Sequence, residues 1–342
     1  TAPILWTSPS RWLSLLLNRK GAFWLRRRRE VDEKVLSRFD EAESTCRCLL
    51  ALNASDSRQL CRLCETGFLT RPLDGLFART SFWDGLDPAL RVCHIARALS
   101  EKYSNWTFSH TTAAVMYGLN VGYSHLDKVH VVASSGSRKG DKVVRHRSKR
   151  ASRLVNGVKL TTPEETVLDC AAIMPFPDAL AVADSAISSR LTCERNLRNA
   201  AVHRAGYRGI RVGRRVVAHA DGRAESGGES IVRGILIELG YLIKDIQTPV
   251  PSIEGSKGPL RLDILLQADD GSLVDLEVDG GEKYENPEMN GGSVLRAMMR
   301  ERQREAGITA RGYKVMRVTV AQARAREWLK ARLAAYGVHP AV

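Results

Sequence analysis

The stretch "LRLDILLQADDGSLVDLEVD", residues 260–279, decides the fold of the last third of this chain. Its two apolar runs, 260–266 and 273–278, flank the tripeptide "DDG", which is typical of a tight turn between antiparallel strands. Because side chains alternate across a strand, Glu277 and Asp279 are expected on one face of this hairpin, and the apolar residues between them on the other. The sequence therefore predicts a hairpin with an acidic face.

A further acid precedes the hairpin on a predicted helix. Apolar residues recur at helical spacing from Glu229 to Ile243, with a break at Gly240, so Glu229 falls in the first turn of an amphipathic helix. Asp263 lies on the first strand of the hairpin and Glu277 on the second. A hard cation such as Mg²⁺ binds through carboxylates, water and substrate phosphate. We therefore predict a site for Mg²⁺, or Mn²⁺, at the four acids Glu229, Asp263, Glu277 and Asp279.

Four motifs mark the C-terminal third, residues 225–320: "ESGGESIVRGILIELGY", "LRLDILL", "LVDLEVDGGEKY" and "RGYKVMRVTV". Through these motifs the segment resembles the PD-(D/E)XK nuclease superfamily and, within it, the very-short-patch-repair-endonuclease-like proteins. The resemblance implies a restriction-endonuclease-like fold over residues 225–342, with Glu229, Asp263 and Glu277 as metal ligands. It also implies hydrolysis of DNA phosphodiester bonds.

One position departs from the superfamily pattern, because Asp279 stands where the E-x-K motif has lysine. The residue that activates water is therefore open between Asp279, Lys283 and Gln247, and the candidate catalytic set is Glu229, Asp263, Glu277, Asp279 and Lys283. The same departure favours an alternative, a regulator that binds DNA without cleaving it. A module that binds only other proteins is the third interpretation.

Charge points to a polyanionic partner. The 342 residues contain 52 Lys and Arg against 38 Asp and Glu, a net charge of +14. Such an excess is typical of proteins that bind nucleic acid, so DNA is the predicted partner. A chain of this length is expected to fold as two or three domains.

Cysteine usage and hydropathy bear on location. Seven cysteines in a long chain fit a reducing cytoplasm rather than a disulfide scaffold. No apolar run approaches ~18 residues, so no membrane span is expected. Cys46, Cys48, Cys61 and Cys64 could be read as zinc ligands, but two of them share an apolar helical pattern, which favours packing.

The N-terminal region predicts a winged helix over residues 31–85, after a basic tail, 1–30, that is expected to be disordered. A helical pattern covers 31–53, a second helix runs from Ser55 or Asp56 to Gly67, and 68–79 reads as a hairpin turned at Gly75. In a winged helix the second helix can enter a major groove while the wing lies against phosphates. The predicted DNA contacts on this helix and wing are Arg58, Arg62 and Arg71.

The middle region, 86–197, contains two distinctive segments, "WTFSHTTAAVMYGL", 106–119, and "VNGVKLTTPEETVLDCA", 155–171. Both resemble segments of AbiEi-type antitoxins and their actinobacterial relatives. The resemblance implies an α/β middle domain, a DNA-binding regulator, and a cognate toxin protein as a partner. In the second segment Thr162 and Glu165 form a predicted capping box. Asp169 and Asp184 are expected to be structural or solvent-facing rather than catalytic.

Further positive charge lies in three segments. Residues 138–153 hold eight Lys and Arg against one acid, a density that suits phosphate contacts or a solvated loop. Residues 198–224 suggest a basic linker or a short helix. A basic helix follows the acidic hairpin. The predicted contacts with nucleic acid in these segments are Arg145, Arg147, Arg150, Arg300 and Arg302. The predicted whole is an α+β multidomain protein with a winged helix, a middle α/β region and a restriction-endonuclease-like C-terminal fold.

Overall fold

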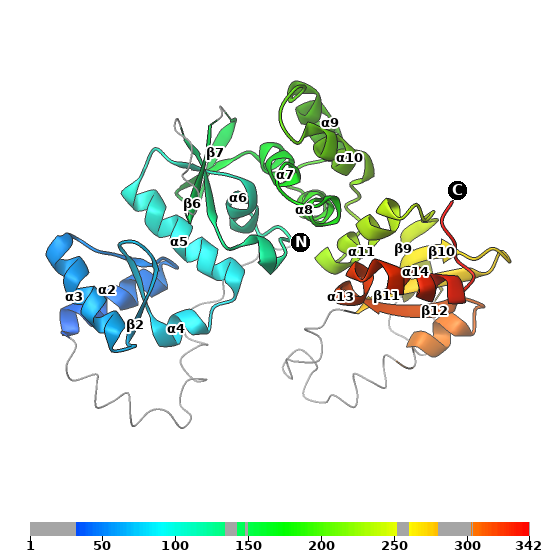
Figure 1. Ribbon diagram of the computed structural model, residues 1–342, viewed down its shortest axis with the longest axis horizontal. Coiled ribbons are helices and arrows are strands. Elements are labelled where there is room, and N and C mark those ends of the chain that lie inside the picture. Colours follow the sequence, from blue (N-terminus) through cyan, green and yellow to red (C-terminus); the bar gives the residue numbers. More distant parts are fainter. Residues whose placement is uncertain are drawn as a thin grey trace.

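The computed structural model describes residues 32–133, 142–147, 150–251, 260–279, 302 and 304–341. These residues form a mixed α and β structure with three separate sheets. Figure 1 shows the three sheet-containing regions in chain order, with the middle region between the other two. The predicted α+β class is therefore confirmed, whereas the predicted tail, 1–30, lies outside the described residues.

The N-terminal region is a small unit of three helices and three short strands. Its sheet has the antiparallel order β1-β3-β2, and Phe39, Leu60 and Phe77 lie in its core. The prediction that helical structure continues to residue 53 is wrong, because Leu49 and Leu50 pair with β3 as a strand. The elements are α2 (Glu33–Ser44), β1 (Leu49–Leu50), α3 (Ala54–Glu65), β2 (Leu69–Leu73), β3 (Leu76–Arg79) and α4 (Thr80–Asp84).

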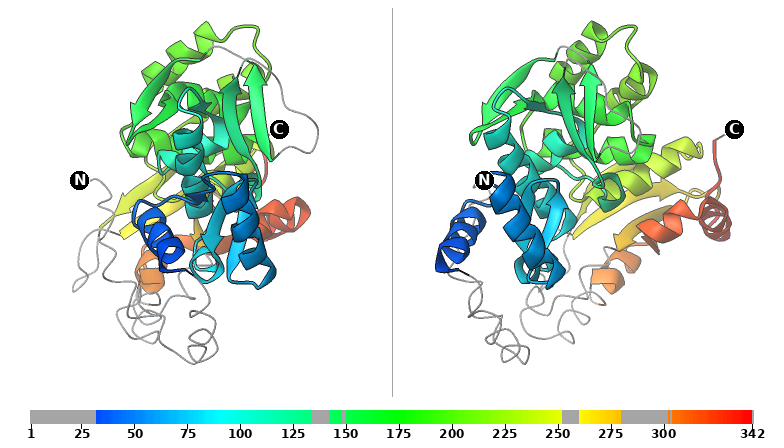
Figure 2. Two further views of the ribbon diagram at one scale, coloured as in Figure 1. Left: turned by 90° about the vertical axis from the view of Figure 1, so that its left-hand side faces the viewer. Right: turned by 60° about the vertical axis from the view of Figure 1, so that its left-hand side comes forward.

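A five-stranded sheet in the order β6-β5-β4-β8-β7 forms the centre of the middle region. In both views of Figure 2 this sheet lies above the N-terminal helices. Phe108 and Leu160 pair on adjacent central strands and are fully buried. The elements are α5 (Pro88–Lys102), β4 (Thr107–Phe108), α6 (His110–Met116), η3 (Tyr123–His125), β5 (Val129–Ala133), β6 (Val143–Arg147), β7 (Ser152–Val155), β8 (Val158–Thr161), α7 (Pro163–Ala171) and α8 (Phe176–Ser188).

The predicted cap of α7 is confirmed only in part. Thr162 accepts a hydrogen bond from the backbone N–H of Glu165, as a helix cap does. The Glu165 side chain does not return to the cap, because it accepts from Arg204 instead. The capping signal therefore located the start of the helix but not the partner of its glutamate.

Residues 198–224 are not an extended linker. They include the end of α9 (Glu194–His203) and all of α10 (Ile210–His219). Val216 and Val217 of α10 are buried in the same core as Leu168 and Leu180. The helical alternative for this segment was the correct one, since α10 turns one apolar side toward α7 and α8.

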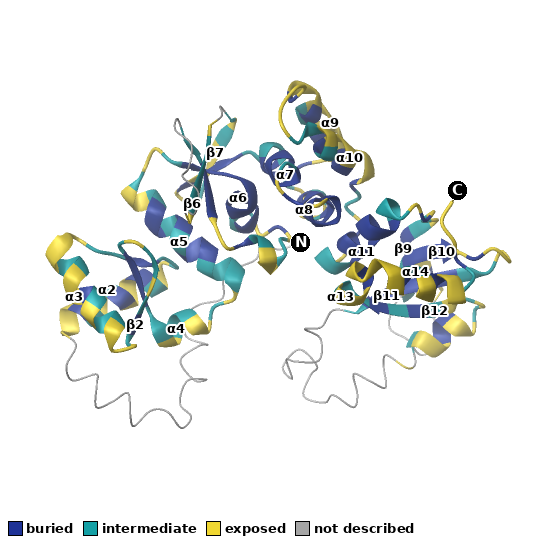
Figure 3. Ribbon diagram, viewed as in Figure 1, coloured by how far each residue is buried: buried dark blue, intermediate teal, exposed yellow. Residues whose placement is uncertain are grey.

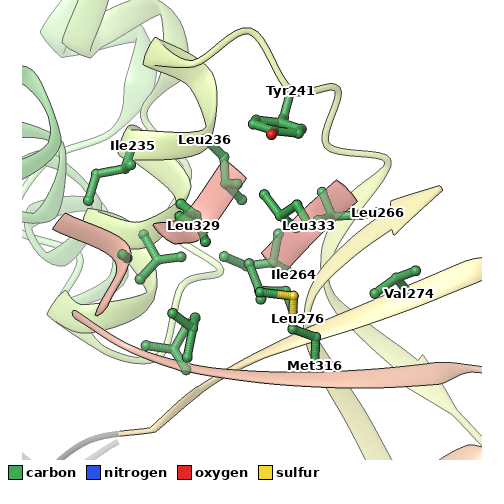
Figure 4. Packing of buried hydrophobic residues seen from close by; sticks show 14 of the residues in the cluster. Ile235, Leu236, Tyr241, Ile264, Leu266, Val274, Leu276, Met316, Leu329 and Leu333 are labelled. Atoms are coloured by element: carbon green, nitrogen blue, oxygen red, sulfur yellow. The ribbon is translucent and has the colours of Figure 1, made fainter. Parts of the chain in front are cut away.

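The C-terminal region is a four-stranded mixed sheet with helices beside it. The sheet order is β12-β11-β10-β9, in which β11 and β12 are parallel and the other pairs antiparallel. Figure 4 shows Leu236, Leu276 and Leu333 packed together on one face of this sheet. Residues 304–309 are helical and contribute Ile308 to a second cluster. The elements are α11 (Gly227–Glu238), β9 (Asp245–Val250), β10 (Leu260–Gln267), β11 (Leu273–Asp279), β12 (Lys314–Thr319), α13 (Val320–Arg324) and α14 (Arg326–Ala335).

The middle and C-terminal regions meet along α8 and α11. Both helices are largely buried in Figure 3. Gly234 allows this approach, because a Cβ there would lie 2.6 Å from Cα of Pro177. Arg233 also donates a hydrogen bond to the buried Asp184 at 2.7 Å, so that carboxylate is structural rather than solvent-facing. Among the described residues, no helix is both long and apolar enough to cross a membrane.

Candidate metal and nucleic-acid site

Two of the predicted metal ligands share one face of the C-terminal sheet. Ile264 on β10 faces Leu276 on β11, and continuing this antiparallel register by one residue sets Asp263 opposite Glu277. Asp263 accepts a hydrogen bond from the backbone N–H of Val278 at 3.0 Å, which fixes its carboxylate beside β11. The face that carries both acids is opposite the one packed against α11 and α14.

A third carboxylate on this face, Asp275, was not predicted as a site residue. Its side chain is fully buried, and neither of its oxygens meets a hydrogen-bond donor among the described residues. Burial, followed by the charges of the nearby Glu277 and Asp263, raises the pKa of Asp275 to about 8. The signal for it was the alternation of Asp275, Glu277 and Asp279 at every second position, which puts all three on one face.

Glu229 reaches the sheet through Gln247. Ser226 caps α11, and the Glu229 carboxylate accepts from Ser226 Oγ at 2.8 Å and from the backbone N–H of Glu225 at 2.9 Å. It also accepts from Nε2 of Gln247 at 2.8 Å. The register of β9 and β10 sets Gln247 beside Asp263. The hydrogen bond from Gln247 therefore connects Glu229 on α11 to β9, the strand beside the pair formed by Asp263 and Glu277.

The Gln247 position has two unusual features. Its φ of 51° lies in the left-handed region, which an unbranched polar residue adopts at a cost of about 1 kcal/mol or more. Its buried Oε1 has no hydrogen-bond donor among the described residues. A strained backbone and an unpartnered oxygen at one residue are typical of a functional position.

Two arginines neutralise the acidic face. Arg304 contacts Glu277 directly and lies 4.0 Å from Asp263, while Arg317 on β12 lies 3.2 Å from Glu277. Arg317 also lies 3.6 Å from Asp279 at the end of β11. Within the described part of the chain, Asp263, Glu277 and Asp279 each have an arginine within salt-bridge distance, whereas the buried Asp275 has no such partner.

The side-chain oxygens on this face are of the kind that binds a hard divalent cation. Carboxylate and amide oxygens are the ligands that Mg²⁺ and Mn²⁺ prefer, and Asp275 and Gln247 supply oxygens without donors. Arg304 opposes a cation at Glu277, since like charges repel. In the described part of the chain, these acids do not bring three ligand atoms within 4.8 Å of one another. Lys283, the other candidate for water activation, lies outside the described residues.

The arginines of the N-terminal unit that are predicted to contact DNA differ in their ion pairing. Arg58 and Arg62 are exposed on α3, one turn apart. Arg71 is exposed on β2 and pairs with Asp74 at 2.9 Å. Arg79, at the other side of the hairpin, is instead held by Glu43 and Asp40 of α2. Of these arginines, Arg58 and Arg62 are thus exposed together on one helix, whereas Arg71 and Arg79 are in ion pairs.

The later basic residues also separate into exposed and paired groups. Arg147 is exposed and Arg145 half-buried on β6, which lies at the edge of the middle sheet. Arg150 is 3.2 Å from Asp169, whose side chain is buried, so Asp169 is structural rather than solvent-facing. Arg302 is exposed, and Arg300 lies outside the described residues. Arg150 therefore serves an internal ion pair in this structure.

Comparison with known proteins gives relatives without an assigned role. Two uncharacterized proteins of Mycobacterium tuberculosis, from strains CDC 1551 / Oshkosh and ATCC 25618 / H37Rv, are each 30% identical to this chain over 167 residues. The match covers 48% of this chain and 56% of each relative, so the chain spans about half the length of these curated relatives. No family model matches the chain, and no solved structure matches it significantly.

Proposed function

We propose that this chain is a DNA-binding protein with a metal-dependent, endonuclease-like C-terminal domain. The observation that carries the proposal is the pairing of Asp263 with Glu277 on one sheet face, with Glu229 joined to the neighbouring strand through Gln247. The order of elements supports it: a helix, three antiparallel strands, helical residues 304–309 and a parallel strand. This is the order that the PD-(D/E)XK resemblance implies.

The proposed roles follow from the chemistry of each side chain. Asp263 and Glu277 would hold Mg²⁺ or Mn²⁺, which when bound offsets negative charge on the phosphate oxygens. Glu229, oriented by Gln247, would align a ligand or a water molecule. Asp275, kept protonated by burial at neutral pH, can donate a hydrogen bond to a neighbouring carboxylate. Asp279 and Lys283 remain the candidates for accepting the proton of the attacking water.

Arg304 takes a second role in this proposal. Its guanidinium pairs with Glu277 in the protein alone, where two or three acids on one face would otherwise repel each other. A guanidinium also binds phosphate through two parallel hydrogen bonds. We expect Arg304 to leave Glu277 and contact the DNA backbone when a metal ion and substrate are present.

DNA binding in the front half is the second part of the proposal. A helix followed by a hairpin, with Arg58 and Arg62 exposed on the helix, suits entry into a groove with the hairpin against phosphates. Arg145 and Arg147 on the edge strand β6 would add phosphate contacts. The net charge of +14 supports a polyanionic partner.

A second candidate function is a regulator or antitoxin that binds DNA without cleaving it. The specific observation that favours it is the neutralisation of Glu277 by both Arg304 and Arg317, together with Asp279 at the position of the motif lysine. In that case the C-terminal sheet would serve as a DNA clamp or as a platform for a cognate toxin protein.

A nicking assay distinguishes the two candidates. Supercoiled plasmid and a mismatched duplex are incubated with the full chain and Mg²⁺ or Mn²⁺, and the wild type is compared with Asp263→Asn and Glu277→Gln. Glu327→Gln, an exposed acid on α14, is the matched control. Cleavage by the wild type and the control alone supports the nuclease. If all four proteins bind DNA and the extent of nicking is the same for all of them, the result supports the regulator.

A further inference from the structure

Three histidines from distant parts of the chain meet in the middle region. His110 begins α6, His130 lies on β5, and His146 lies on the edge strand β6. Among the described residues they form a group whose ligand atoms all lie within 4.8 Å of one another. The rings of His110 and His146 stack with centroids 3.6 Å apart, and Nδ1 of His130 lies 2.8 Å from Nε2 of His146. Nothing in their sequence spacing indicates this cluster.

The backbone holds one of these rings in a strained conformation. His110 has a φ of 51°, in the left-handed region that glycine prefers, at the first position of a helix. Its Nδ1 lies 2.9 Å from Ser109 Oγ and 3.8 Å from Asp169 Oδ2, and that carboxylate oxygen has no hydrogen-bond donor among the described residues.

The electrostatics around the cluster leave the imidazoles neutral. Burial lowers the pKa of His130 to about 3 and that of His146 to about 4, and it lowers the pKa of His110 as well. Neutral imidazole is the form that binds metal ions. Nearby, Arg150 and Arg204 are each paired with Glu165 and Asp169, so two positive charges meet two negative ones.

We propose that His110, His130 and His146 form a binding site for a transition-metal ion of the zinc class. Imidazole nitrogen is a preferred ligand of Zn²⁺, Co²⁺ and Ni²⁺, whereas Mg²⁺ prefers oxygen. Ser109 Oγ lies at hydrogen-bond distance from Nδ1 of His110, and the carboxylate of Asp169 lies behind the same nitrogen at 3.8 Å. Hydrogen-bonded partners of this kind fix the tautomer of many metal-bound histidines. The site is therefore chemically distinct from the acidic face of the C-terminal sheet.

Binding requires the rings to reorient and the strand to shift. Because the rings of His110 and His146 stack with nearly parallel planes, at least one of them must turn before their nitrogen lone pairs meet at one ion. Two nitrogens bound to the same tetrahedral Zn²⁺ at about 2.1 Å lie roughly 3.4 Å apart. His130 and His146 would therefore exchange their mutual hydrogen bond for two metal bonds as the edge strand β6 moves outward by about half an ångström. The ion would then tie β6, which carries Arg145 and Arg147, to β5 and α6. Its expected role is to order the basic edge of the middle sheet.

Cobalt titration of the full chain tests the proposal. The protein is prepared without a polyhistidine tag, treated with chelator and titrated with Co²⁺. We expect a saturable visible d–d absorption at one equivalent that Zn²⁺ abolishes by displacement, and a rise in the melting temperature with either ion. His146→Gln and His130→Gln are expected to weaken binding at least about 100-fold, since even outer residues of metal sites contribute 10–100-fold.

Two control variants separate this site from others. His339→Gln, an exposed histidine elsewhere, and Cys61→Ser, a half-buried member of the cysteine group, are expected to bind Co²⁺ like the wild type. A band that persists in folded His146→Gln, or that is lost in Cys61→Ser, would overturn the assignment. So would the absence of a saturable band in the wild type.

A further measurement uses only the wild type, so its result does not depend on whether the variants fold. X-ray absorption at the zinc edge of the loaded full chain is expected to show the outer-shell scattering of about three imidazole rings. A first shell that contains sulfur, or oxygen without imidazole scattering, would contradict the site. The histidine proposal can fail without affecting the proposed nuclease function, because the two sites share no residues.

Discussion

Arg304 donates a hydrogen bond from its Nη1 to Oε1 of Glu277 across the acidic face of the C-terminal sheet. The same side chain donates from Nη2 to the backbone carbonyl of Arg261 at 2.7 Å. It is thus anchored to β10 while it neutralises an acid on β11. In this arrangement a protein cation holds the place where a divalent ion is proposed to bind, so the two compete for Glu277.

Removal of this arginine is expected to strengthen metal binding. Arg304→Gln should bind Mn²⁺ about threefold to tenfold more tightly than the wild type, because one competing charge is lost near two carboxylates. Electron paramagnetic resonance of free Mn²⁺ measures the affinity. Arg302→Gln, an exposed arginine two residues away, is the control and should change little. Unchanged or weaker binding in Arg304→Gln would count against competition for Glu277.

Asp275 is expected to make stability depend on pH. Its carboxyl binds a proton more tightly in the folded chain, with a pKa of about 8, than at its ordinary value of 3.8. Its favourable contribution is therefore complete below the lower value and is lost as the pH rises toward the higher one. The free energy of unfolding should fall with pH in this window, by at most about 1.4 kcal/mol per pH unit.

The variant Asp275→Asn keeps the neutral state at every pH and should flatten this slope. Urea unfolding at several pH values between 5 and 8, with Asp270→Asn in the exposed turn as the control, measures the difference. If the wild type and Asp275→Asn have parallel pH profiles, Asp275 does not carry a raised pKa.

The bond between Gln247 and Glu229 is expected to contribute measurably to stability. Gln247→Leu removes a donor from a buried carboxylate, which should lower the free energy of unfolding by about 1–3 kcal/mol. Gln267→Leu, on the exposed part of β10, should cost less than about 0.5 kcal/mol. Chemical unfolding gives both values. Equal effects of the two substitutions would show that Glu229 does not depend on Gln247.

The exposed arginines of α3 are expected to set the salt dependence of DNA binding. Each lost phosphate contact should reduce the slope of log K against log salt by about 0.9, so Arg58→Ala with Arg62→Ala should reduce it by about 1.8. Filter binding at several salt concentrations measures the slope. Arg195→Ala with Arg198→Ala, on exposed α9, is the control of equal charge. A flat response in the wild type would favour the protein-binding interpretation.

The elements with strong local signals were predictable from the sequence. The helical spacing after Glu229, the "DDG" turn and the alternation at Glu277 and Asp279 located α11, β10 and β11 and their acidic face. These features depend on residues close together in the chain, where periodicity and turn chemistry act directly. The start of α7 at Thr162 was predictable for the same reason.

Features that depend on distant residues were not predictable. Leu49 and Leu50 continue a helical pattern, yet pairing with β3 makes them a strand. The Arg304 contact with Glu277 and the Arg150 contact with Asp169 join side chains that no local rule connects. The histidine cluster is the clearest example, because its three members come from separate elements of the middle region.

Anomalous diffraction from crystals soaked in Mn²⁺ tests the central claim most directly, namely that the acidic face holds a divalent metal ion. We predict a peak at about 2.1 Å from carboxylate oxygens of both Asp263 and Glu277, with Arg304 displaced from Glu277. The peak should be absent in Glu277→Gln and present in Glu327→Gln. A structure with saturating Mn²⁺ in which Arg304 still contacts Glu277, with no peak at this face, would contradict the account.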